Sequence, residues 1–141
     1  MRTIHYQLQS EDLKLAVKRI VQDLEDAHIY EGELFVTRVL PSEGSMTSTP
    51  AGLPHLVVEE EKCVKLLGLI PYRRKKTILV IKEGFCDVED TGSKEMFVVL
   101  RSRRCEAVAR KHLEEYGRRH QVTQIVYWGR NRFRPKYAVS P

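Results

Sequence analysis

The fold is decided by the stretch Glu95-Met96-Phe97-Val98-Val99-Leu100 and by the residues that follow it as far as Trp128. Residues 95–100 are largely apolar and predict a buried strand. Ser102 is a suitable helix cap, and the helix that it opens is expected to run to Tyr116 and to end at Gly117. The apolar face of this helix consists of Cys105, Val108, Ala109, His112, Leu113 and Tyr116. Residues 122–128 predict a second strand, so the unit reads strand, helix, strand.

The same layout occurs near the N-terminus, 92 positions earlier. Residues 3–8 alternate weakly and predict a strand, Ser10 is a suitable cap, and residues 34–40 predict another strand that Pro41 ends. The helix between them is expected over residues 11–27, with an apolar face of Leu13, Ala16, Val17, Ile20, Val21 and Leu24. Two such βαβ units predict an α+β protein with a ferredoxin-like sandwich, in which both helices cover one face of a mainly antiparallel sheet.

The segment between the two units is less regular. Residues 41–55 are rich in Pro, Gly, Ser and Thr and predict a long flexible loop, and residues 84–94 predict a second loop. Residues 56–58 fit a short strand, and Glu59 to Leu67 fit either a short helix with an acidic start or a continuous strand. Pro71 to Lys76 predict a basic turn. Residues 77–81 predict a strand that forms a hairpin with residues 95–100.

The composition is that of a globular protein, with 42% apolar and 30% charged residues. The 141 residues are expected to form a single domain, 1–141. No apolar run approaches the roughly 20 residues of a membrane helix, and the N-terminus lacks the apolar stretch of a signal peptide, so a cytosolic protein without membrane contact is expected. The three cysteines are far apart and form no CxxC, which argues against a disulfide framework and a zinc site.

The positive charge is concentrated in the second half of the chain. Residues 1–70 carry 7 Lys and Arg against 11 Asp and Glu, whereas residues 71–141 carry 17 against 8. A chain polarised in this way often presents one basic surface, which attracts anions such as phosphates. The alternative is that these residues only solvate the outer faces of the C-terminal elements.

The strongest candidate for binding is the segment from Tyr127 to Tyr137, which interleaves four cations with four aromatic residues. Arginine pairs with phosphate through two hydrogen bonds, and aromatic rings stack on bases. The phosphate-binding candidates are Arg130, Arg132, Arg134 and Lys136, and the stacking candidates are Tyr127, Trp128 and Phe133. The alternative is a terminal edge strand with a buried aromatic face and a charged outer face.

Two further basic segments add to this signal. Arg73 and Arg74 lie in the run of four cations that ends at Lys76 and could contact phosphates without reading sequence. The outer face of the C-terminal helix is also basic, although a solvated face with i,i+4 ion pairs explains it more simply. If the three segments meet on one face, their joint signal exceeds that of any one segment.

Catalytic candidates are weak. His55 follows the long loop, and Glu59, Glu60 and Glu61 form an acidic cluster that could act in acid–base chemistry, although a helix start explains the acids more simply. Residues 44–49 could cradle a phosphate. No P-loop, Rossmann or nucleophile-elbow motif is present, and neither a cofactor nor a metal site is expected.

Two functions remain in competition. The first is a binding module for a phosphate-rich partner, most simply nucleic acid, through the basic and aromatic C-terminal surface. The second is a homo-oligomer that binds or acts on a small anionic metabolite or nucleotide at an inter-subunit cleft, with residues 41–55 as a lid. A protein-interaction module is a third possibility. The small size, high charge and absence of catalytic motifs are typical of many phage or mobile-element proteins, which identifies no family.

Overall fold

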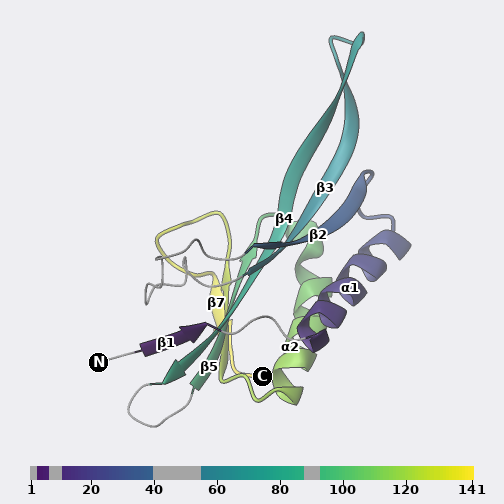
Figure 1. The fold of residues 1–141 in the computed structure, drawn as a ribbon. Helices are drawn as coiled ribbons and strands as arrows, with labels where there is room; N and C mark the ends of the chain where they lie inside the picture. Colours follow the sequence, from purple (N-terminus) through teal and green to yellow (C-terminus); the bar gives the residue numbers. More distant parts are fainter. Residues whose placement is uncertain (1–2, 7–10, 40–54, 88–92) are drawn as a thin grey trace.

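The computed structural model describes residues 3–6, 11–39, 55–87 and 93–141, and within them it is an α+β structure with one mixed sheet (Figure 1). The sheet has seven strands, and six of them follow the order β2-β3-β4-β5-β6-β7. The strands are β1 (Thr3–Tyr6), β2 (Glu33–Val39), β3 (His55–Leu66), β4 (Ile70–Asp87), β5 (Ser93–Leu100), β6 (Gln124–Trp128) and β7 (Tyr137–Val139). The helices are α1 (Glu11–Asp26), the short 3₁₀ helix η2 (Arg103–Cys105) and α2 (Glu106–Arg119).

Most neighbouring strands in this sheet are antiparallel. The exception is the pair β5 and β6, which run parallel and are connected through α2. Strand β1 pairs with β4 over Gly84–Asp87, beyond the residues of β4 that pair with β3. Because β5 pairs with the other side of β4 at these residues, β1 lies on the same side of β4 as β3, further along the strand.

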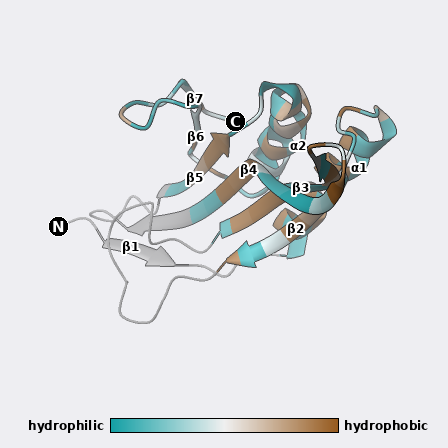
Figure 2. Ribbon diagram, turned by 90° about the horizontal axis from the view of Figure 1, so that it is seen from above, coloured by the Kyte–Doolittle hydropathy of each residue, from teal (hydrophilic) through white to brown (hydrophobic). Residues whose placement is uncertain are grey.

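Helices α1 and α2 lie side by side over one face of the sheet, as predicted (Figure 1). Their apolar faces are buried against alternate residues of β3 to β6, because successive side chains of a strand point to opposite faces. Figure 2 shows these apolar stretches of the strands in brown beneath the helices. The fully buried strand residues include Val58, Ile81, Met96, Val98, Ile125 and Tyr127.

The ends of α2 differ from the prediction. Ser102 precedes η2 but makes no side-chain cap hydrogen bond; its hydroxyl accepts one from Tyr30 at 2.6 Å instead. At the other end, the helix continues through Gly117 to Arg119. Gly117 is required for packing rather than for termination, since a Cβ there would lie 2.7 Å from the ring of Pro141.

The ferredoxin-like arrangement is not confirmed, because the strand order differs and only one of the two units is a βαβ unit. Strand β2 runs antiparallel to β3, which runs antiparallel to β4, so β2 and β4 have the same direction. Strand β1 is antiparallel to β4 and hence to β2. The sequence pattern is the same in both units, but pattern does not specify which strands pair.

The middle of the chain is more extended than predicted. Residues 55–66 form one strand. The prediction of a short helix over Glu59 to Leu67 is therefore wrong, and the alternative of a continuous strand is confirmed. Residues 71–76 lie within β4 rather than in a turn. The turn is instead at 67–69, where Leu67 and Gly68 have positive φ angles of 54° and 73°. Long pairing between β3 and β4 stabilises the extended form of both segments.

The predicted hairpin between β4 and β5 is confirmed, with Ile81 opposite Val98. Both strands extend into the expected loop 84–94, since β4 ends at Asp87 and β5 begins at Ser93. The predicted cap at Ser10 and the loop residues 41–54, including the phosphate cradle at 44–49, lie outside the described residues. No helix in the described part of the chain is long and apolar enough to cross a membrane.

Candidate nucleic-acid interface

Six positively charged residues converge where β5 and β6 end. Because these strands are parallel, their carboxyl ends meet at the same edge of the sheet, which is where open α/β sheets tend to bind ligands. Arg101 follows β5 directly, and Arg130 follows β6 after Gly129. The backbone N–H of Arg101 donates to the carbonyl of Ile78 at 3.0 Å, which holds the end of β5 against β4.

Two hollows lie at this edge and share Arg101, Gly129 and Asn131. The first, of about 230 Å³, lies between the start of α2 and the loop after β6. Its cationic lining is Arg101, Arg103, Arg130 and Lys136.

The second hollow has a volume of about 400 Å³ and lies on the sheet face away from the helices. Its side chains alternate along β5 with the buried residues Met96, Val98 and Leu100, and therefore point to the opposite face. The strand register places Lys82 opposite Phe97 and Val99 opposite Trp128. The lining consists of Lys82, Phe97, Val99, Arg101, Trp128, Gly129, Asn131 and Arg132.

We call these two adjoining hollows the basic cleft. Its cations are Lys82, Arg101, Arg103, Arg130, Arg132 and Lys136, and its aromatic residues are Phe97 and Trp128. Both aromatic side chains are partly buried, so the surrounding structure fixes them while a part of each remains accessible. The cleft therefore offers cations for phosphates beside aromatic surface for bases.

The electrostatics of the cleft favour an anion. Partial burial lowers the pKa of Lys82, and the positive charge of Arg101 lowers it further. The acidic residue of the lining, Glu106, is already engaged: it accepts hydrogen bonds from Lys136 at 2.8 Å and from the Tyr137 hydroxyl at 2.7 Å. These two bonds lower the pKa of Glu106. Within the described part of the chain, Lys136 is the one cation of the cleft that forms an ion pair.

The predicted tail residues are distributed unevenly around this cleft. Arg130, Arg132 and Trp128 line it, whereas Lys136 lines it but is paired with Glu106. The loop between β6 and β7 also carries Arg134, which is exposed, and Phe133, which is 96% exposed.

Tyr127 cannot serve as a stacking residue. It lies on the helix-facing side of β6, is fully buried and donates a hydrogen bond to Glu114 at 3.4 Å. Its ring packs against that of Tyr137, with the ring centroids 5.0 Å apart. Strand alternation separates it from Trp128, so only one of two adjacent aromatic residues can face the cleft.

Sequence reasoning missed Lys82, Phe97 and Arg101, whereas Arg103 belongs to the basic face predicted for the C-terminal helix. Phe97 and Arg101 could have been predicted, because alternation along residues 95–101 places both on the face opposite the buried residues. Lys82 could not be found in this way, since its proximity to Phe97 depends on the register between β4 and β5.

The remaining candidates lie elsewhere. Arg73 and Arg74 are on the exposed part of β4. His55 begins β3 opposite Lys82, at the border of the open sheet face. Glu60 is buried and accepts a hydrogen bond from the Gly32 N–H at 3.0 Å, and Glu61 pairs with Arg73 at 3.2 Å. Glu59 lies opposite Phe35 on the strand pair β2–β3. Because alternate residues of a strand point to opposite faces, Glu60 is separated from Glu59 and Glu61, which line one hollow together.

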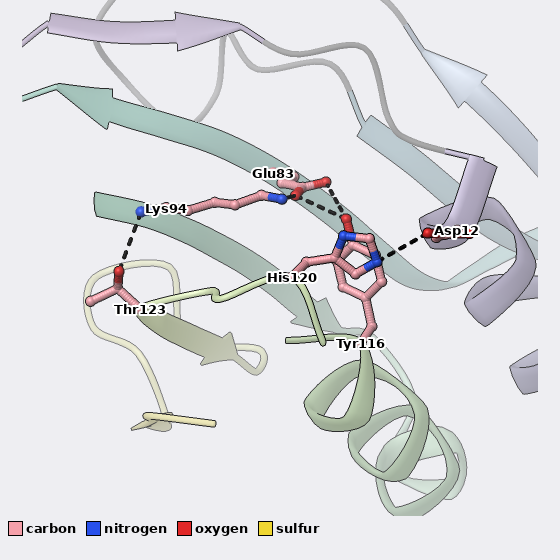
Figure 3. A network of polar contacts seen from close by, with 6 residues as sticks. All are labelled: Asp12, Glu83, Lys94, Tyr116, His120 and Thr123. Carbon is pink, nitrogen blue, oxygen red and sulfur yellow. Dashed lines mark hydrogen bonds and ion pairs between the residues drawn. The ribbon is translucent and has the colours of Figure 1, made fainter. Parts of the chain in front are cut away.

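A polar network centred on the buried residue Glu83 lies on the other face of the sheet (Figure 3). Glu83 is 2% exposed, pairs with Lys94 at 2.7 Å and accepts a hydrogen bond from the Tyr116 hydroxyl at 3.1 Å. His120 stacks on Tyr116, with the ring centroids 4.3 Å apart, and contacts Asp12 at 3.2 Å. This network connects β4, β5 and both helices, which is a structural role.

Among the described residues, no group of His, Cys, Asp or Glu could hold a metal ion. No family model matches the chain, and no curated protein sequence or solved structure shows significant similarity to it. The cleft must therefore be interpreted from its own chemistry.

Proposed function

We propose that the protein binds nucleic acid, with one strand in the basic cleft. The observation that carries the proposal is that Lys82 and Arg101 lie in one hollow with the partly buried residues Phe97 and Trp128. Phosphates would contact Arg101, Arg103, Arg130 and Arg132, which no acid neutralises among the described residues. Stacking of a base on an aromatic ring contributes roughly 1–3 kcal/mol and tolerates any base.

Fluorescence anisotropy with a labelled single-stranded oligonucleotide tests this proposal. The affinity is expected to fall with salt, with a slope of log K against log salt of about −0.7 per phosphate contact. The variant Arg101→Gln/Arg130→Gln removes two contacts, and should bind more weakly and reduce the steepness of this slope by about 1.4.

The matched control is Lys18→Gln/Arg118→Gln, which removes the same charge from exposed positions on α1 and α2. It should bind nearly as well as the unaltered protein, because it leaves the cleft intact. An equal loss of affinity in both variants would show that only net charge matters, and the absence of binding at low salt would end the proposal.

The competing candidate, a small anionic metabolite or nucleotide, is favoured by the volume of the open-face hollow. About 400 Å³ lies within the range of ordinary ligand pockets, about 300–1,000 Å³. A mononucleotide that displaces a labelled oligonucleotide at similar concentration would support it. Affinity that instead rises with oligonucleotide length would support the nucleic-acid proposal, since longer strands make more phosphate contacts.

A further inference from the structure

The hairpin of β3 and β4 extends well beyond the rest of the sheet, as a twisted two-stranded ribbon (Figure 1). The last residue of β3 that pairs with β2 is Glu61. From Lys62 to Leu66 the strand pairs only with β4, over Ile70 to Arg74. At roughly 3.4 Å per residue these five residues project about 17 Å. We call residues 62–76 the arm.

The arm has an unusual charge. It contains six cations, Lys62, Lys65, Arg73, Arg74, Lys75 and Lys76, and no acid. The last two lie at its base, where Lys75 is opposite Glu61 and Lys76 is opposite Glu60 on β3. Lys62 and Arg73 form ion pairs with Glu31 and Glu61 at its base, at 3.8 and 3.2 Å. The other four are not ion-paired with any described residue. Because opposite residues of the ribbon share a face, Arg74 lies on one face and Lys65 and Lys75 on the other.

The tip of the arm is apolar and accessible. Leu67 is 88% exposed and Leu69 is 84% exposed, and Ile70 and Tyr72 are exposed as well. Val64 and Tyr72 are cross-strand partners, a type of pair that stabilises a ribbon. Large apolar side chains at the end of a basic projection suit contact with a partner that is apolar within and anionic at its borders.

The arm and the basic cleft lie at the same end of the sheet. Strand β4 leaves the arm at Lys76, and Ile78, two residues later, accepts the hydrogen bond from Arg101. Two residues of a strand span about 7 Å. The cations of the arm therefore continue into those of the cleft, and the two basic surfaces can engage one polyanion together.

We propose that the arm enters a groove of double-stranded DNA while the cleft holds a single strand, so the preferred ligand is a duplex with a single-stranded tail. A two-stranded ribbon fits the major groove, which is about 12 Å wide and 8.5 Å deep. Phosphates border a groove on both sides, which matches cations on both faces of the arm, and the apolar tip meets base edges such as the methyl group of thymine. The major groove of A-form RNA is too narrow and deep for side chains to read, which selects DNA.

The proposal rests on the proposed function and adds the duplex to it. A second copy of the chain is disfavoured as the occupant of the arm, because two arms with six cations each would repel one another. An anionic membrane surface would also suit a projection with basic flanks and an apolar tip. Binding to membrane vesicles is therefore measured separately.

The experiment measures the affinity of the full chain for three labelled DNAs: a single strand, a blunt duplex and a duplex with a single-stranded tail. The tailed duplex should bind at least about 10-fold more tightly than either part, because joined sites raise the effective concentration of the second. The tip variant Leu69→Ser/Ile70→Thr keeps the cations of the arm, so it should lose part of this gain and bind the tailed duplex more weakly than the unaltered protein does. Both substituted residues are exposed, so this variant should fold. An unchanged affinity for the single strand would confirm that it does.

The cleft variant Arg101→Gln/Arg130→Gln should show the converse, with single-strand binding weakened and blunt-duplex binding retained. If the tip variant binds the tailed duplex as the unaltered protein does, the arm proposal is wrong and the cleft proposal stands. If the unaltered protein does not bind the single strand, the proposed function is wrong. Binding to phosphatidylserine vesicles that the tip variant loses, with duplex affinity unchanged, would also overturn the role of the arm in DNA binding.

Discussion

At the scale of single residues, the cleft holds the charge of Lys82 in surroundings that destabilise the charged form. Lys82 is partly buried beside Arg101, and both burial and this neighbour lower its pKa. A lowered lysine pKa means that the folded state holds the proton less tightly than the unfolded state. An anion in the cleft would reverse this effect, so the same residue should oppose stability and favour binding.

The substitution Lys82→Met tests this opposition. Because it removes a desolvated charge and keeps the stem, it should raise the melting temperature by about 2 °C, which at this chain length corresponds to about 0.5 kcal/mol. It should also weaken oligonucleotide binding. Differential scanning calorimetry and anisotropy measure the two effects, and Lys18→Met, at an exposed site on α1, is the control that should change neither.

A lower melting temperature for Lys82→Met would contradict this interpretation. The Lys82 ammonium group would then contribute to stability despite its partial burial beside Arg101.

Glu106 holds the loop after β6 in place through Lys136 and Tyr137, and its pKa is lowered by these hydrogen bonds. Since the folded pKa lies below the ordinary value of about 4.5, the stabilisation is complete above that pH and is lost as the pH falls through the folded pKa. Glu106→Gln should therefore melt at a lower temperature than the unaltered protein at pH 7, and the difference should shrink below pH of about 4.5. Thermal melts at several pH values measure this difference in melting temperature, with Glu25→Gln as an exposed control. A difference that does not depend on pH would contradict the role given to the Glu106 carboxylate.

At the scale of secondary-structure elements, the helices and most strands follow from hydrophobic periodicity, because one side of each must be buried. The acidic run from Glu59 to Glu61 shows where this fails. On its own it fits a helix start, but β2 and β4 pair with it from both sides and extend it. Pairing of this kind depends on residues far apart in sequence, so local pattern cannot decide it.

The ion pair between Glu83 and Lys94 joins neighbouring strands beneath α2, and the side chains are 3% and 17% exposed. Lys94→Met leaves the Glu83 carboxylate buried without this partner and should destabilise the protein by about 3 kcal/mol in urea unfolding. The double variant Glu83→Leu/Lys94→Met should be less destabilised than the sum of the two single variants, since it leaves no buried charge unpaired.

A comparison with Lys14→Met calibrates this result. The partner of Lys14 is Glu11, whose side chain is 87% exposed, so the change should cost less than about 0.5 kcal/mol. Additive losses in the Glu83 and Lys94 cycle would show that the two side chains act independently and would contradict the role given to the network.

At the scale of the whole molecule, the charge asymmetry of the sequence predicts a basic surface but not where it lies. The topology supplies the location: the parallel pair β5 and β6 ends at the same edge from which the arm projects. Arg130, Arg132 and Trp128 could be predicted from sequence because they are dense in one segment. Lys82 and Phe97 could not be joined to them, since the register of three strands brings these residues together.

The central claim is that a nucleic-acid strand lies in the basic cleft, and the most direct measurement is the intrinsic fluorescence of Trp128 during titration with a single-stranded oligonucleotide. The chain has one tryptophan, so the signal reports this site alone. Stacking of a base on the ring should quench the fluorescence to a plateau that salt reverses, and Arg101→Gln/Arg130→Gln should shift the titration to higher concentration. Binding detected by anisotropy with no change in Trp128 fluorescence would contradict the claim, because the strand would then lie elsewhere.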